Sequence, residues 1–103
     1  MGLHTKKDEK IQLRHPGGKE AVRISREKYE LLRSSLESVL RKAKAASHAE
    51  LVKAVSRELK ARRVVFDGSV AWYLEWVKLD MEARKLLKRL PDSSPQLFTL
   101  ARK

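Results

Sequence analysis

The fold is decided by residues 68–90, which read GSVAWYLEWVKLDMEARKLLKRL. Ser69 is placed to cap a helix that we expect to run to about Arg84, and a short basic strand follows it. Residues 91–95 are rich in proline and serine, as a turn is, and residues 96–100 alternate as a second short strand does. This part of the chain therefore predicts a helix that leads directly into a β-hairpin.

Two further helices are predicted before this segment. Ser25 is a natural cap for a helix that runs to about Ala45. Ser47 and Glu50 have the spacing of a capping box, in which each side chain satisfies a free amide at the start of a second helix. The expected buried stripes are Tyr29, Leu32, Leu36, Val39, Leu40 and Ala43 in the first helix, and Val52, Val55 and Leu59 in the second.

The N-terminal part predicts a hairpin. Residues 1–10 are polar and we expect them to be flexible. Residues 11–14 and 21–24 alternate apolar and polar side chains, and residues 15–20 supply the glycines and proline of a turn. Residues 11–101 are predicted to form a single α+β domain. A hairpin, three helices and a C-terminal hairpin, or wing, follow the order of a winged helix-turn-helix domain, whose third helix and wing face nucleic acid.

Several short motifs add a resemblance to a family. They are His15-Pro-Gly, the entry from Ile24 to Tyr29, Gly68-Ser69 before the Trp72-Tyr73 pair, and the run from Val77 to Arg84. Together they resemble an uncharacterised family of small winged helix-turn-helix proteins over about residues 11–100. The resemblance implies the fold and no activity. Lys85 departs from many winged-helix chains, which place a glycine there to end the helix, so we expect a blunter helix end or backbone strain.

The net charge of +11 and the isoelectric point near 10.3 are the strongest compositional signals. A small basic domain attracts polyanions, above all nucleic acid. The alternative is a charged surface that only keeps the protein soluble. With 42% apolar residues, the chain is too hydrophobic for a disordered basic tail.

Composition also excludes several classes of protein. The chain has no cysteine, which excludes disulfides, thiolate catalysis and cysteine-based zinc sites. The N-terminus lacks the apolar core of a signal peptide, and no apolar run approaches the roughly 20 residues that span a bilayer. We therefore expect a soluble, cytoplasmic protein. The charge would allow binding at an anionic membrane surface, but neither terminus predicts a basic amphipathic helix with an exposed apolar face, so we expect no membrane partner.

The third helix is poorly suited to reading DNA bases. At 100° per residue its core face comprises Val70, Tyr73, Leu74, Val77 and Met81. The remaining polar window comprises Ala71, Glu75, Lys78 and Glu82. This window offers two carboxylates and only one lysine. Because phosphates repel carboxylates, we do not expect this helix to read bases in the major groove.

A second apolar strip on this helix comprises Trp72, Trp76, Leu79 and Ala83. Large aromatic side chains usually pack in a core, and these can lie against the first helix or either hairpin. Alternatively, the strip is exposed and contacts a protein partner or a second copy of the chain.

The candidate nucleic-acid contacts are mostly basic residues outside the third helix. They are Arg62, Arg63, Ser69, Lys78, Arg84, Lys85, Lys88 and Arg89, with Arg102 and Lys103 after the last strand. A basic wing can hold phosphates without reading bases. The competing interpretation is an edge strand that its charges protect from aggregation.

Nothing in the sequence indicates catalysis. His4, His15 and His48 are isolated, and no metal-binding or phosphate-loop motif accompanies them. Asp80 lies four residues before Arg84, the spacing of a structural ion pair that would orient the wing. The sequence thus predicts a non-catalytic protein without cofactor or metal. It is expected to bind nucleic acid, with double-stranded DNA the leading partner, at low sequence specificity; the alternative is a protein-interaction or homodimerisation module.

Overall fold

The computed structural model describes residues 9–101. Residues 1–8 of the expected flexible N-terminus, and the cations Arg102 and Lys103, lie outside the described residues. In chain order the elements are β1 (Lys10–Gln12), β2 (Arg23–Ser25), α1 (Arg26–Ala43), β3 (Ala46–Ser47), α2 (His48–Ala61), α3 (Val70–Ala83), β4 (Leu87–Arg89) and β5 (Leu97–Leu100). Three helices and two small antiparallel sheets make this an α+β fold, as predicted.

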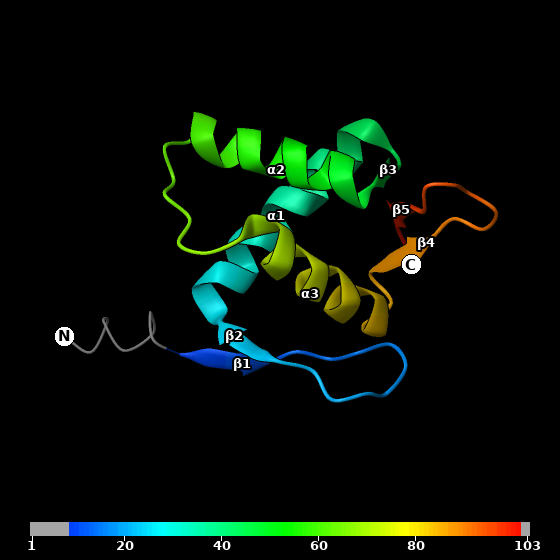
Figure 1. Ribbon diagram of the computed structural model, residues 1–103, viewed down its shortest axis with the longest axis horizontal. Helices are drawn as coiled ribbons and strands as arrows, with labels where there is room; N and C mark the ends of the chain where they lie inside the picture. The colour runs from blue at the N-terminus through cyan, green and yellow to red at the C-terminus, as the bar shows by residue number, and fades with distance from the viewer. Residues whose placement is uncertain (1–8, 102–103) are drawn as a thin grey trace.

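The helices form the centre of the molecule, with a sheet at each of two sides (Figure 1). The β1–β2 hairpin lies below α1 and α3 in this view, and β3, β4 and β5 lie together at the right. The predicted N-terminal hairpin is present, and in it Ile11 is paired with Ile24. Its strands are shorter than expected, and the Leu13 amide extends them with one bond to the Val22 carbonyl at 3.0 Å.

All three predicted helix caps are present. Ser25, Ser47 and Ser69 each accept a hydrogen bond from the amide three residues later. The capping box of α2 is complete, because Glu50 in turn accepts from the Ser47 amide at 2.9 Å. Such caps contribute about 1 kcal/mol each to helix stability, and they depend only on nearby residues. That locality explains why the sequence predicted them.

The second sheet has the strand order β3–β5–β4. The β4–β5 hairpin was predicted, and it pairs Leu87 with Leu100. Strand β3 was not predicted, because two residues are too few to show the period of a strand. It pairs Ala46 with Phe98 and so joins the entry of α2 to the last strand.

The core lies between the three helices and is closed by the two sheets. Its fully buried apolar side chains include Leu32, Leu36, Leu51, Val55, Leu74, Val77 and Met81. The predicted stripes are largely confirmed, with two corrections. Leu51 rather than Val52 is the buried residue at the start of α2, and Ala43 is exposed because α1 ends there.

Helices α2 and α3 both end in a left-handed residue that is not glycine. After α3, Lys85 has a φ of 63°. Its amide donates to the Glu82 carbonyl, and the Leu86 amide donates to the Met81 carbonyl, which together form a Schellman motif. The strain expected at Lys85 is thus confirmed. Arg63 has the same role after α2, with a φ of 58°.

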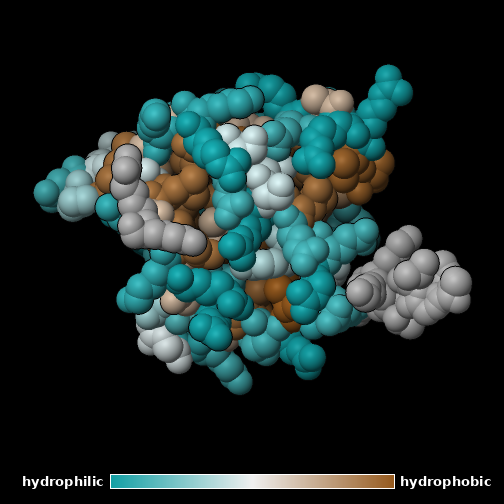
Figure 2. All heavy atoms as spheres, turned by 180° about the vertical axis from the view of Figure 1, so that it is seen from behind, coloured by the Kyte–Doolittle hydropathy of each residue, from teal (hydrophilic) through white to brown (hydrophobic). Residues whose placement is uncertain are grey.

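Seen from behind, the surface is mostly hydrophilic, with separate apolar areas between the polar side chains (Figure 2). Within residues 9–101, no helix combines the length and the apolar character needed to cross a membrane.

Candidate functional site

The outward side of α3 carries apolar and acidic side chains. Trp72 is 48% exposed, and Glu75 is exposed beside it. Trp76 and Leu79 are partly buried, so the predicted apolar strip is neither wholly core nor wholly surface. Between Val70 and Ala83 there is no exposed cation, since Lys78 is the helix's only one and it is buried.

Lys78 does not lie on the surface, contrary to the prediction. It is only 2% exposed, because Phe98 of β5 covers it. Its ammonium nitrogen lies 3.7 Å from the centroid of the Phe98 ring and 3.3 Å from Oε1 of Glu75. Burial lowers the pKa of Lys78, and the Glu75 carboxylate opposes that shift. Lys78 is therefore not an open surface cation like Lys85 or Lys88.

Two arginines of the β4–β5 region are bound to carboxylates. Arg84 donates from Nε to Asp80 Oδ2 at 2.7 Å, and this contact holds the pKa of Arg84 above its usual value. Arg89 donates from Nε to Glu82 Oε1 at 3.0 Å. Both arginines are therefore less available to an external anion than their position in the sequence suggested.

Lys88 is the cation of this hairpin that projects freely. It is exposed, it makes no ion pair within the described chain, and it is the cross-strand partner of Thr99. Because alternate strand residues point to opposite faces, Lys88 and Thr99 share the face opposite Phe98. Lys85 is likewise exposed just before the strand.

The end of α1 lies against this same face of the sheet. Thr99 donates from its hydroxyl to the Lys44 carbonyl at 2.7 Å. Lys44 is exposed and has a φ of 72°, which directs the chain sharply into β3. The structure thus brings the Lys44 backbone against Thr99, the cross-strand neighbour of Lys88, and we call Lys44, Lys88 and Thr99 the outer basic face. Sequence reasoning missed Lys44, since its contact is 55 residues away along the chain.

Arg62 and Arg63 lie apart from the outer basic face. They follow the C-terminal end of α2, whereas its N-terminal end is joined to β5 through Ser47 and Leu97. A helix of 14 residues is about 21 Å long, so the two groups are at opposite ends of α2. Figure 1 shows this separation. Ser69, the remaining candidate, is exposed, and its hydroxyl caps α3.

The apolar strip of α3 continues into the α2–α3 connection as an aromatic cluster. Trp72 packs edge-to-face on Tyr73, and Tyr73 packs in the same way on Phe66, with ring centroids 5.0 and 5.3 Å apart. The Lys28 ammonium lies 4.5 Å from the Tyr73 centroid. Next to Phe66, Val65 is 95% exposed.

Asp80 is the centre of a buried polar network. The predicted pair with Arg84 is confirmed, and Asp80 also accepts from the Tyr29 hydroxyl at 2.6 Å and from the Arg14 amide at 2.8 Å. Burial raises the pKa of Tyr29, and the hydrogen bond to Asp80 raises it further. Asp80 thus holds the N-terminal hairpin and α1 against α3, which is more than the expected orientation of the wing.

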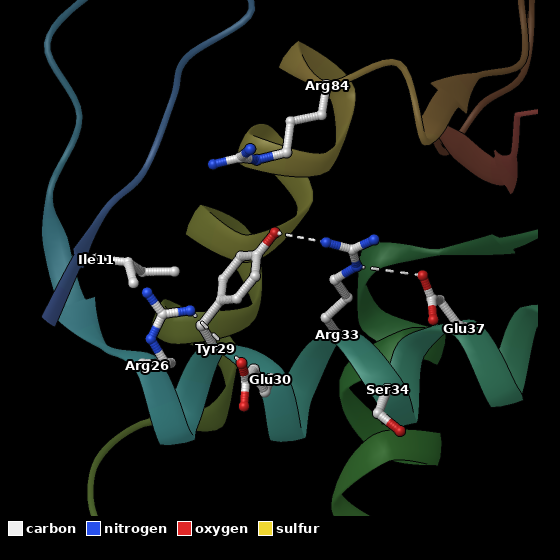
Figure 3. Close-up of a pocket in the computed structure, with 8 residues that line it drawn as sticks. All are labelled: Ile11, Arg26, Tyr29, Glu30, Arg33, Ser34, Glu37 and Arg84. Atoms are coloured by element: carbon white, nitrogen blue, oxygen red, sulfur yellow. Dashed lines mark hydrogen bonds and ion pairs between the residues drawn. The ribbon is translucent and has the colours of Figure 1, made fainter. Parts of the chain in front are cut away.

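An open cavity of about 540 Å³ lies beside this network (Figure 3). Tyr29 stands in its middle, and Arg33 donates to the Tyr29 hydroxyl at 3.3 Å and to Glu37. Arg26 and Arg84, which also line it, pair with Glu9 and Asp80. Every guanidinium here already has a carboxylate partner, so the arrangement serves the fold.

The described residues contain no group of three His, Asp or Glu side chains that could hold a metal ion. His15 uses Nδ1 to accept from the Gly17 amide at 2.9 Å, which closes the turn of the N-terminal hairpin. His48 lies at the start of α2, beside Glu75 and Lys78.

Comparison with known proteins identifies the family without an activity. No curated protein and no solved structure matches the chain. A family model described as a family of unknown function, DUF6958, matches residues 10–98, which include every helix and almost all of both sheets. The chain therefore belongs to this uncharacterised family.

Proposed function

We propose that the protein binds double-stranded nucleic acid without catalysing a reaction, mainly through lysine contacts with backbone phosphates. The order of the elements supports this proposal. Helices α1, α2 and α3 are followed by a hairpin, and the sheet order is β3–β5–β4, which is the order of elements expected of a winged helix with β4–β5 as its wing. Folds of the helix-turn-helix class bind DNA in many proteins, although a fold by itself does not fix a function.

The observation that carries the proposal is the outer basic face. Lys44 and Lys88 are exposed on one side of the sheet, and neither makes an ion pair within residues 9–101. Two lysines without acidic partners on a chain of net charge +11 leave a positive potential there, which a phosphate backbone would neutralise.

Sequence discrimination should be poor in this mode of binding. The side of α3 that a helix-turn-helix protein normally places in the major groove bears Trp72 and Glu75. Neither forms the bidentate contacts by which Arg, Asn or Gln recognise bases. Affinity would then come from phosphates, which carry no sequence information.

The test is fluorescence anisotropy of labelled duplexes of unrelated sequence across a salt series. Wild-type protein should bind all of them at low salt and lose affinity steeply as salt rises. Lys44→Ala/Lys88→Ala should weaken binding to every duplex alike and reduce the slope of log K against log salt by about 2, since each phosphate contact contributes about 0.9.

The matched control is Arg62→Ala/Arg63→Ala, which removes the same charge from the opposite end of α2. The slope of log K against log salt for this control should be closer to the wild-type slope than that of Lys44→Ala/Lys88→Ala. Equal losses in the two double variants would mean that net charge alone attracts the duplex, and no binding at low salt would remove the proposal.

A second candidate function is self-association through the aromatic cluster. It is favoured by the 95% exposure of Val65 and the 48% exposure of Trp72, because an apolar side chain so open to water gains from being covered. Sedimentation velocity over a concentration series tests it, with Val65→Ser/Trp72→Ser as the variant. A concentration-dependent dimer that the variant abolishes would support this function, and a monomer at all concentrations would exclude it.

A further inference from the structure

A small pocket lies where α2, α3 and the β4–β5 hairpin meet. Its volume is about 280 Å³, and it is separate from both the outer basic face and the aromatic cluster. The side chains that line it include Lys78, Arg89 and His48, with Glu75 as the carboxylate and Phe98 as the aromatic wall. Three nitrogen-bearing side chains and one acid thus line the pocket, and a second acid just outside the lining, Glu82, holds Arg89 at 3.0 Å.

Lys78 is incompletely satisfied in this pocket. An ammonium group has three N–H donors and no acceptor. Among the described residues, its one ion-pair partner is Glu75, whose side chain is 48% exposed and so can turn out to solvent. The Phe98 ring attracts the positive charge but accepts no conventional hydrogen bond. Burying an ammonium with so few acceptors is costly, and an acceptor entering the pocket would offset that cost.

His48 adds a second unmet group. Its Nδ1 atom is buried without a hydrogen-bond partner and lies 3.5 Å from Glu75 Oε1. The capping box of α2 occupies the amides of Ser47 and Glu50, and the amides of the intervening first turn have no partner within the helix. The positive end of the α2 dipole therefore adds to the two cationic side chains that line the pocket.

We propose that this pocket binds a small anion of the phosphate class, with Lys78 as its main ligand and with His48 and Arg89, which also stays paired with Glu82, as further donors. On binding, the anion takes the place of the Glu75 carboxylate beside Lys78, and Glu75 turns toward solvent. The volume suits inorganic phosphate or a compact phosphate ester and is below that of most drug-sized ligand sites. The proposal does not rest on nucleic-acid binding by the outer basic face.

Nuclear magnetic resonance titration with inorganic phosphate tests the site, with sodium chloride at matched ionic strength as the ion control. Phosphate should shift the signals of His48, Glu75 and Lys78, and chloride should not. Lys78→Met should reduce the apparent phosphate affinity by at least about tenfold, because a charge-assisted contact is lost. Lys53→Met removes an exposed lysine of α2 and should leave the affinity unchanged.

Glu75→Gln provides an independent check that does not depend on the folding of the lysine variant. Removing the competing carboxylate should raise phosphate affinity several-fold, whereas a pocket that needs Glu75 for its structure would bind more weakly. Shifts that Lys78→Met and Lys53→Met reduce equally, or no shift at millimolar phosphate, would overturn the proposal.

The anion could be a backbone phosphate of a nucleic-acid duplex or a free phosphate compound, and a duplex titration distinguishes these two sources. If the pocket takes a backbone phosphate, Lys78→Met weakens duplex binding and inorganic phosphate competes with the duplex. If it takes a free phosphate compound, Lys78→Met leaves duplex binding as in wild type while the phosphate shifts are lost. Both results support the anion site in the pocket and identify the source of its ligand. The separate proposal that the outer basic face binds nucleic acid is tested by Lys44→Ala/Lys88→Ala, so the two proposals can fail independently.

Discussion

Helix α3 buries two charged residues of opposite sign, and their surroundings differ. Asp80 is fully buried and accepts three hydrogen bonds, from the Arg84 guanidinium, the Tyr29 hydroxyl and the Arg14 amide. Lys78, two residues earlier, has one exposed carboxylate and an aromatic ring. A buried charge with its full set of partners holds a fold together, whereas one with few partners leaves room for a ligand.

The largest expected effect comes from breaking the Asp80 network. Asp80→Ala leaves the Tyr29 hydroxyl and the Arg14 amide without their acceptor, and it removes the partner of Arg84. We expect a loss of about 3 kcal/mol in the free energy of unfolding, measured by urea denaturation. The control is Glu82→Ala, which breaks the partly exposed pair with Arg89 and should cost about 1 kcal/mol or less. Similar losses in the two variants would contradict the central role of Asp80.

Lys78→Met tests the other member of the comparison, the buried charge that has few partners. The substitution removes an attraction to Glu75 and Phe98, but it also removes the cost of keeping an ammonium out of water. We expect the free energy of unfolding to stay within about 1 kcal/mol of wild type or to rise, because the Glu75 carboxylate that loses its partner is 48% exposed and stays hydrated. A loss as large as that of Asp80→Ala would mean that Lys78 is needed for the fold, as Asp80 is.

The smallest effect is a dependence on pH through His48. Burial, with Lys78 adding to it, lowers the pKa of His48 in the folded state, against the opposing effect of Glu75. The unfolded chain therefore binds a proton first, at a pKa near 6.5. The His48 contribution to stability is complete above that pH and falls as the pH drops below it.

Urea midpoints at pH 7.5 and 5.5 measure this contribution. His48→Gln should lose less stability over that interval than wild type, since Gln does not titrate. The groups that face His48 include Glu75 and Lys78 from α3 and Arg89 from β4, so the same measurement in Glu75→Gln should show a larger loss. Identical pH dependence in wild type and His48→Gln would contradict this assignment.

The difference between Asp80 and Lys78 also shows what local sequence can reveal. The Asp80–Arg84 pair follows from a four-residue spacing, and the three serine caps follow from residues three positions apart. The other two partners of Asp80 are 51 and 66 residues away along the chain, and no local pattern points to them.

The prediction that Lys78 lies on the exposed side of α3 was wrong for the same reason. A helical projection assigns it to the polar side, and only the distant Phe98 makes that side an interior. The contact between Thr99 and Lys44, which forms the outer basic face, likewise depends on how β5 folds back over the end of α1. The helices and both hairpins could thus be predicted from the sequence, and the surfaces that those elements make together could not.

The cover that Phe98 places over Lys78 makes this amine a reporter of local opening. Every other lysine in residues 9–101 is exposed or partly exposed, so an amine-reactive reagent would label those quickly. Lys78 would be labelled only when the Glu75 and Phe98 side chains beside it move aside, and its labelling rate then measures how often this side of the C-terminal sheet opens without the whole protein unfolding. A ligand in the pocket would slow that rate, whereas a duplex held only at the outer basic face would leave Lys78 as reactive as the sheet's own opening allows.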